Sequence, residues 1–217
     1  MFIELVDSLR CVRPHGPIWL VASAFRMDER DIVSGELGCP TCGARYPIDR
    51  GIADFRDGGA APESGPMRTD IETLSPADEA MRAAALLDLA EPGGFIVLAG
   101  AWSAAAHEVA ALVERVHVLG LNPEEGVESG GGVSLVLAST QIPLRAGVTR
   151  GIALDSAHAT STLLLSAADA LRPGGRLIAP AHAPLPTGFT EFARDEHHWV
   201  AEKQAAPGPV VQLRVFR

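Results

Sequence analysis

The chain has 217 residues, of which 47% are hydrophobic, and its 18 basic and 27 acidic residues give a net charge of -9. This acidic balance disfavours direct binding of nucleic acid, and the apolar content is enough to bury the core of one domain and a small module. No apolar stretch reaches the roughly 18 residues of a membrane span, and the first residues lack the basic start and apolar core of a signal peptide. Three cysteines argue against a disulfide scaffold. We therefore expect a cytoplasmic protein, off the membrane, whose partner is a protein or a second copy.

Residues 1–56 predict a small and nearly neutral module. Phe2–Arg10 has the apolar spacing of a short helix, Ile18–Ala22 is a candidate strand, and Ile32-Val33 follows a polar turn. The segment Cys39-Pro40-Thr41-Cys42-Gly43 carries the strongest chemical signal of the chain.

Two thiolates separated by two residues can face one tetrahedral metal ion, and the glycine that follows permits the tight turn. A redox Cys-x-x-Cys motif is instead expected between a strand and a helix of thioredoxin type, which this segment lacks. We predict a zinc site whose ligands are Cys11, His15, Cys39 and Cys42. Two alternatives stay open: a metal-free ribbon in which the cysteines are small apolar residues, and a His15 that lies in a surface turn.

The order of these features, with Tyr46-Pro47-Ile48 and Gly51-Ile52 after the cysteine pair, resembles the small zinc-ribbon proteins that activate methyltransferases acting on RNA and on release factors. The chain departs from that family at its first knuckle, where Pro14 stands in place of a second cysteine. The resemblance implies a module that extends the sheet of a methyltransferase domain by adding a strand. Here such a domain can follow in the same chain.

The segment 57–74 is rich in glycine and proline and predicts a linker. A helix is expected to begin at Ser75, which can cap it, with Pro76 in its first turn. Strands and helices then alternate, which predicts a doubly wound, mostly parallel sheet. The expected strands are 95–99, 117–121, 133–138, 151–155, 176–180, 198–203 and 209–216, and the expected helices are 104–116, 161–171 and 190–194.

The segment Leu171-Arg172-Pro173-Gly174-Gly175-Arg176-Leu177, with the element order before it, resembles the class I S-adenosylmethionine-dependent methyltransferases. The fold class expected is therefore α/β: a doubly wound, mostly parallel, seven-stranded methyltransferase-like (Rossmann-like) sheet with a small N-terminal zinc-ribbon-like module. The domains expected are 1–56 for the ribbon, 57–74 for the linker and 75–217 for the methyltransferase-like domain.

The resemblance also implies three positions for the cofactor S-adenosylmethionine. The glycines of the loop after the first strand fall on Gly100, Trp102 and Ala104, with Ala101 also in the loop. The acid that holds the ribose falls on Asn122, and the adenine-side acid falls on Ser139 and Thr140. An indole occupies space that a ligand needs, and Asn122 loses a charge-assisted contact. These departures favour a domain that does not bind the cofactor in the usual way.

Three polar residues follow the fourth and fifth strands and are expected at the carboxyl edge of the sheet: Asp155, His158 and His182. A carboxylate and two imidazoles can move a substrate proton, while the alternative is that they cap loops at the rim. The sequence thus predicts a pseudoenzyme, a non-catalytic or strongly modified methyltransferase-like protein that acts through protein contacts or an unassigned ligand. The alternative is an active methyltransferase with an atypical cofactor site.

Overall fold

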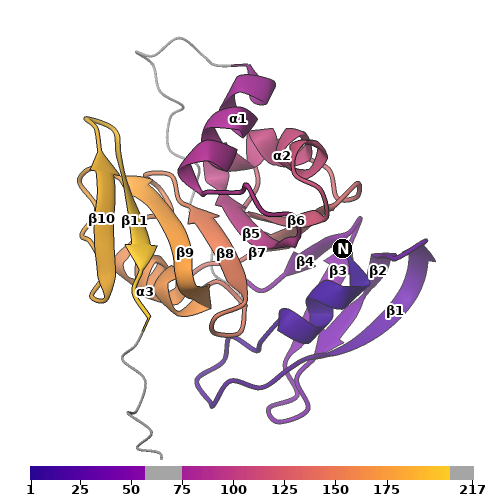
Figure 1. Cartoon of the computed structure of the whole chain (residues 1–217). Helices are drawn as coiled ribbons and strands as arrows, with labels where there is room; N and C mark the ends of the chain where they lie inside the picture. The colour runs from indigo at the N-terminus through magenta and orange to yellow at the C-terminus, as the bar shows by residue number, and fades with distance from the viewer. Residues whose placement is uncertain (57–74, 206–217) are drawn as a thin grey trace, which may run out of the picture.

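The computed structural model describes residues 1–56 and 75–205, and its strands form one continuous sheet (Figure 1). The strand order is β1-β2-β3-β4-β7-β6-β5-β8-β9-β11-β10. The strands are β1 (Val21–Asp28), β2 (Asp31–Gly38), β3 (Arg45–Asp49), β4 (Ile52–Asp54), β5 (Gly94–Ala99), β6 (Val116–Leu121), β7 (Val133–Leu137), β8 (Thr149–Ala153), β9 (Leu171–Pro180), β10 (Phe189–Arg194) and β11 (His198–Lys203). The expected count of seven strands is wrong for the described part of the chain, because the four strands of the N-terminal module join the same sheet and bring the total to 11.

The central strands have the doubly wound arrangement predicted from the sequence. The chain steps from β5 to β6 and β7 in one direction, then returns to β8 and β9 on the other side of β5, all with parallel pairing. The antiparallel strands β11 and β10 close that end of the sheet. The reversal between β5 and β8 is the point at which sheets of this kind usually bind ligands.

The N-terminal module adds its last strand to the edge of the central sheet. β4 pairs in parallel with β7, with Ile52 opposite Leu135 and Asp54 opposite Leu137. β1, β2 and β3 continue from β4 as an antiparallel meander. The β7 edge is therefore covered within the same chain, by the mode of contact that the ribbon resemblance implies.

Five helical segments of the described residues cover the sheet. Two are 3-10 helices, η1 (Ile3–Ser8) and η2 (Gly100–Ala105), and three are α-helices, α1 (Pro76–Leu86), α2 (Ala106–Leu112) and α3 (Ser161–Ala170). The predicted cap of α1 is confirmed, because Ser75 Oγ accepts a hydrogen bond from the N–H of Asp78 at 3.2 Å. α1 and α2 pack on one face, and η1 and α3 on the other. The connection between β7 and β8, residues 138–148, contains no helix, and η1 lies against it instead: Leu9 bridges to Leu144.

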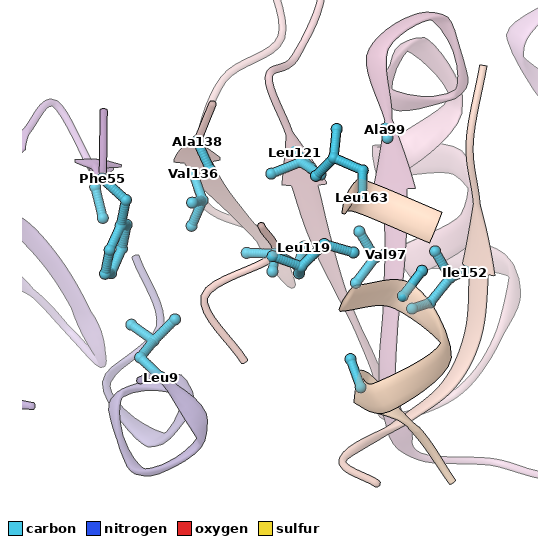
Figure 2. Packing of buried hydrophobic residues seen from close by; sticks show 14 of the residues in the cluster. Leu9, Phe55, Val97, Ala99, Leu119, Leu121, Val136, Ala138, Ile152 and Leu163 are labelled. Carbon is cyan, nitrogen blue, oxygen red and sulfur yellow. The ribbon is translucent and has the colours of Figure 1, made fainter. Parts of the chain in front are cut away.

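The core beneath η1 and α3 runs without a break from the N-terminal module into the central sheet. Figure 2 shows Leu9 and Phe55 at one end of a row of side chains that continues through Val136 and Leu119 to Ile152. Leu9 is fully buried and Phe55 is 2% exposed. The two predicted modules therefore share one hydrophobic core.

Several predicted elements differ from the structure. The short helix expected at Thr190–Arg194 is wrong: these residues lie in strand β10, which pairs with β11, and almost all of them are exposed. The helix expected over 104–116 is shorter in the structure. Its first residues belong to the 3-10 helix η2, α2 follows, and the backbone is already extended at Val113. The strand expected at Ile18–Ala22 begins at Val21 and runs to Asp28. The linker at 57–74 and the strand expected at 209–216 lie outside the described residues.

A buried histidine, His117 on β6, lies where the N-terminus meets the sheet. Its ring stacks on Phe2 with centroids 4.5 Å apart, and its Nε2 hydrogen-bonds to Ser134 Oγ at 2.9 Å. Burial lowers the pKa of His117 to about 4.

The low pKa of His117 predicts a loss of stability in mild acid. The unfolded chain takes up this proton near pH 6.5 and the folded chain near pH 4, so the free energy of unfolding falls as the pH drops through that window. The expected loss is of the order of 3 kcal/mol. Urea denaturation at pH 7, 5.5 and 4 measures it in the natural chain and in His117→Phe, which should lose most of the slope. An equal slope in both proteins would assign the acid sensitivity to other groups.

Candidate metal centre and the carboxyl edge of the sheet

The four predicted metal ligands come together between the loop after η1 and the turn from β2 to β3. The ligand atoms of Cys11, His15, Cys39 and Cys42 all lie within 4.8 Å of one another. Cys11 Sγ lies 3.7 Å from Cys42 Sγ, and Cys39 Sγ lies 3.5 Å from His15 Nε2. In a tetrahedral zinc site with bonds of about 2.3 Å to sulfur and about 2.0 Å to nitrogen, neighbouring ligand atoms lie about 3.5–3.8 Å apart. Both of these distances match the edges of such a tetrahedron.

The surroundings of the cluster suit a metal ion. His15 Nδ1 lies 2.7 Å from the carbonyl oxygen of Gly16, to which it can donate, and this leaves Nε2 as the ligand atom that faces the sulfurs. Burial by itself raises the pKa of Cys39, but the N–H groups of Cys42 and Thr41 outweigh burial and lower that pKa to about 6. Burial raises the pKa of Cys11. A thiolate at Cys39 near neutral pH is the form that binds metal.

Tyr46 is a neighbour of this cluster that the sequence did not assign to it. Its hydroxyl lies 3.1 Å from Cys11 Sγ, and its ring stacks on Phe55 with centroids 4.5 Å apart. The alternation of buried and exposed residues along β3 gives the only sequence signal, because it turns Tyr46 inward. Through Tyr46 and Phe55, the cluster is joined to the shared core.

At the carboxyl edge of the central strands, three predicted site residues form one buried network. His158 Nδ1 lies 2.6 Å from Asp155 Oδ1, and His158 Nε2 lies 3.1 Å from Asn122 Nδ2. Asn122 is also paired with the backbone of Ala138, accepting from its N–H and donating to its C=O, both at 2.8 Å. His158 is fully buried and Asn122 is 4% exposed.

The hydrogen bonds to the backbone of Ala138 determine which atoms of this network donate and which accept. Because the Asn122 amide oxygen accepts from a backbone N–H, its nitrogen must be the group that donates to His158 Nε2. His158 then carries its proton on Nδ1 and donates it to Asp155. Burial raises the pKa of Asp155, but the contacts with His158 and the N–H of Ala101 outweigh burial and lower it below its usual value. The polar atoms that face one another in this network are all paired.

The network occupies the space directly beside Gly100. A Cβ added to Gly100 would overlap Asp155 Oδ2 and would lie 2.7 Å from His158 Nδ1. The N–H of Ala101 donates to Asp155 Oδ2 at 3.0 Å. The backbone turn that a cofactor would contact in this fold thus contacts the protein's own side chains.

The other predicted cofactor and edge residues lie apart from this network. Trp102 is 4% exposed and packs beneath α1, with the Arg82 guanidinium 5.4 Å from its ring centroid and the His198 ring 5.6 Å away. The atoms that a Cβ on Gly100 would meet belong to Asp155 and His158, and the expected crowding of a ligand by Trp102 stays a prediction. His182 is exposed in the loop after β9. Ser139 and Thr140 follow β7 and line a separate cleft.

The contact at Gly100 predicts a large effect of Gly100→Ala on stability. Gly100 has φ +55°, so alanine is strained there by about 1–2 kcal/mol, and overlap with Asp155 adds about 1–3 kcal/mol. Gly174 is a matched control, because its φ is +76° and a Cβ there meets nothing within 4 Å. Chemical denaturation of both variants separates the strain from the overlap. Equal losses for Gly100→Ala and Gly174→Ala would contradict the close packing described here.

Comparisons with known proteins find similarity among solved structures but not in sequence. No protein-family model and no curated protein matches the sequence. Among solved structures, geranyl diphosphate methyltransferase in complex with SAM is 16% identical, with a TM-score of 0.40 over 48% of each chain. The geranyl diphosphate C-methyltransferase of Streptomyces coelicolor is 16% identical, with a TM-score of 0.39 over 57% of this chain and 56% of that one. The MycE methyltransferase of the mycinamycin pathway is 10% identical, with a TM-score of 0.46 over 67% of this chain and 54% of that one.

The chain spans about half the length of these three structures. All three TM-scores are below 0.5, so the α/β fold class rests on the observed strand order. In residues 1–56 and 75–205, no helix has the length and apolar content needed to cross a membrane.

Proposed function

We propose that this chain is a methyltransferase-like protein that does not transfer methyl groups, and that it acts through protein contacts or through a ligand other than S-adenosylmethionine. The observation that carries the proposal is the network of Asp155, His158 and Asn122 beside Gly100. A nucleotide-type cofactor in a doubly wound sheet lies against the turn after the first strand. In this chain Asp155 and His158 lie directly beside that turn, which supports the proposal.

Binding of the cofactor would require this network to open. Each buried donor or acceptor that loses its partner costs about 1–3 kcal/mol, and each 1.4 kcal/mol weakens binding about tenfold. Opening the contacts of both His158 and Asn122 therefore weakens binding by several orders of magnitude relative to an open site.

The test is isothermal titration of the full chain with S-adenosylmethionine. We expect no binding with a dissociation constant below about 1 mM. The variant Asn122→Asp restores an acid at the ribose position and should also fail to bind, because Asp155 and His158 still lie beside Gly100. Micromolar binding by the natural chain would contradict the proposal. Micromolar binding by Asn122→Asp alone would show that the missing acid, and not crowding, prevents binding.

Protein contacts are supported by apolar side chains on and beside the edge strand β1. Trp19 is 66% exposed and Phe25 is 75% exposed, and Val21 and Met27 are exposed as well. β1 is the last strand at its end of the sheet in the described part of the chain. Exposed apolar groups gathered on one edge are typical of surfaces that bind another protein.

We also propose that Cys11, His15, Cys39 and Cys42 bind one structural zinc ion. Four protein ligands leave no open position for a substrate, which is typical of a structural site. The donor spacing and the contact of His15 Nδ1 with Gly16 support this proposal.

The second candidate function is an active methyltransferase with an atypical cofactor site. The observation that favours it is the pair formed by Asp155 and His158 at the carboxyl edge, a carboxylate and an imidazole in contact at the usual position of a ligand. This candidate requires micromolar binding of S-adenosylmethionine, so the same titration separates it from the first.

A further inference from the structure

The two ends of the sheet differ in how charged side chains protect them. Figure 1 shows β1 at one end and β10 at the other. On β10 the Arg194 guanidinium lies 2.6 Å from the Glu191 carboxylate. The exposed Phe192 of the same strand has the Arg176 guanidinium 4.9 Å from its ring centroid. Charged groups of this kind keep an edge strand from pairing with another chain.

β1 has little of this protection. Between Val21 and Met27 its only charged side chain is that of Arg26. The described residues include ten exposed large apolar side chains, and four of these lie within residues 19–27. They are Trp19, Val21, Phe25 and Met27. An edge strand of this composition is open to pairing with a further strand.

The sequence of this edge is nearly symmetric about Ser23. Small residues flank the centre and large apolar residues lie further out: Ala22 and Ala24, then Val21 and Phe25, and at the ends Trp19 and Met27. Two copies of a strand that pair antiparallel about a two-fold axis match each residue with one equally far beyond the centre. With Ser23 on the axis, Val21 of one copy faces Phe25 of the other, and such aromatic pairs with β-branched residues stabilise a sheet.

The backbone and the charges of β1 fit the same register. The pairing of β1 with β2 is regular from Val21 to Ala24, and its two shifts lie between Ala24 and Met27. The centre of a symmetric pair therefore falls in the regular part, and the shifted part of each copy lies toward one end. Arg26 falls opposite Leu20, so no like charges face each other.

The exposed area is enough for a weak dimer. Trp19 is 66% exposed and Phe25 is 75% exposed. An aromatic side chain buries about 150–250 Å², so the four rings of a dimer offer roughly 400–700 Å². With Val21, Met27 and the strand backbones, the buried total reaches about 1,000 Å², the lower limit for a specific interface. We therefore expect a dissociation constant of about 10–100 µM.

From the symmetric edge, the charges and the area, we propose that β1 pairs with β1 of a second copy of this chain, antiparallel and with both Ser23 residues at the two-fold axis. The pairing joins the two sheets into one. It uses the open edge of both copies, so assembly stops at the dimer. A second copy is thus the partner for the protein contacts of the proposed function, and the assignment rests on that part of it.

The first test is sedimentation velocity of the zinc-loaded full chain at concentrations from about 1 to 500 µM. The sedimentation coefficient should rise from that of a monomer toward that of a dimer, with no larger species. At about 1 µM the chain is then a monomer, so denaturation there measures the monomer alone. A monomer at every concentration would overturn the proposal and leave β1 to a different protein. Growth beyond the dimer would also overturn it.

A pair of charge variants tests the register. Val21→Lys and Phe25→Glu should each weaken dimerisation at least about tenfold, because each sets a charge against an apolar residue of the partner. An equal mixture of the two variants should dimerise again, since the lysine of one chain then faces the glutamate of the other. A fluorophore on one variant allows the mixed dimer to be followed. A mixture that dimerises no better than either variant alone would show that the register is wrong.

Phe192→Glu is the matched control at the opposite end of the sheet. Phe192 is 58% exposed, and the new carboxylate would lie near Arg176, so this variant should dimerise as the natural chain does. If Phe192→Glu prevents dimerisation and the two β1 variants do not, the interface lies on β10 and the proposal fails. All three variants should keep the denaturation midpoint of the natural chain at about 1 µM, because the replaced side chains are exposed.

Dimerisation and cofactor binding are measured separately. β1 contributes no residue to the network of Asp155, His158 and Asn122. A monomeric chain that does not bind S-adenosylmethionine would overturn the pairing of β1 and leave the proposed lack of methyl transfer standing. A dimeric chain that binds the cofactor at micromolar concentration would do the reverse.

Discussion

Replacement of Cys39 by serine, or removal of zinc by a chelator, is expected to lower the free energy of unfolding of the whole chain by at least about 5 kcal/mol. Cys39 is 3% exposed and lies in the turn that joins β2 to β3. In a closed site the free energy of metal binding is available to the folded state only, so it adds directly to stability. Because the N-terminal module and the central sheet share one core, the loss is not confined to residues 1–56.

Metal analysis of the purified chain should find one zinc ion per molecule, and urea denaturation with and without chelator measures the stability. Thr41→Ser is a matched control in the same turn and should keep both the metal and the stability. His15→Ala should bind zinc more weakly, whereas His15→Cys should retain it, since a four-cysteine site is also tetrahedral. A metal-free protein whose denaturation midpoint is unchanged by Cys39→Ser would support the metal-free ribbon instead.

Phe55→Ala is expected to destabilise the chain by about 3–5 kcal/mol in a single unfolding transition. Phe55 is 2% exposed, stacks on Tyr46 and lies in the core that runs from η1 to α3. Its removal leaves a cavity at the point where β4 joins β7.

Phe25→Ala is the matched control in the same module. Phe25 is 75% exposed, so its loss should change the free energy of unfolding by less than about 0.5 kcal/mol. The measurement is denaturation followed by far-ultraviolet circular dichroism and by tryptophan fluorescence, which should give coincident curves. Two separate transitions, with only one shifted by Phe55→Ala, would show that the N-terminal module and the central sheet unfold independently.

Local sequence signals predicted the parts of the fold that depend on neighbouring residues. Ser75 and Pro76 marked the start of α1 because a cap and a first-turn proline act within one turn of the helix. The short apolar runs of β5, β6 and β7 were found because these strands are buried on both faces. Thr190–Arg194 failed as a helix because an exposed edge strand has no regular burial pattern, and its pairing with β11 decides its conformation.

The candidate sites show the same division. The spacing of Cys39 and Cys42 suggested a metal ligand pair, since both lie in one turn. The contact between His158 and Asn122 joins residues 36 positions apart, and it exists because the ends of β6 and β8 meet at one edge of the sheet. No local pattern predicts that His158 points at Asn122 and not toward solvent.

By itself, the sequence determined the order of the central parallel strands and the candidate zinc ligands, and it suggested where a cofactor site would depart from the methyltransferase pattern. Only the tertiary structure decided that β4 joins the edge of β7, that one core serves both modules, and that the space beside Gly100 is filled by Asp155 and His158. The reason is physical: turns, caps and burial patterns are set by residues within a few positions of one another, whereas the pairing of strand edges and the filling of a site depend on which distant surfaces fit together.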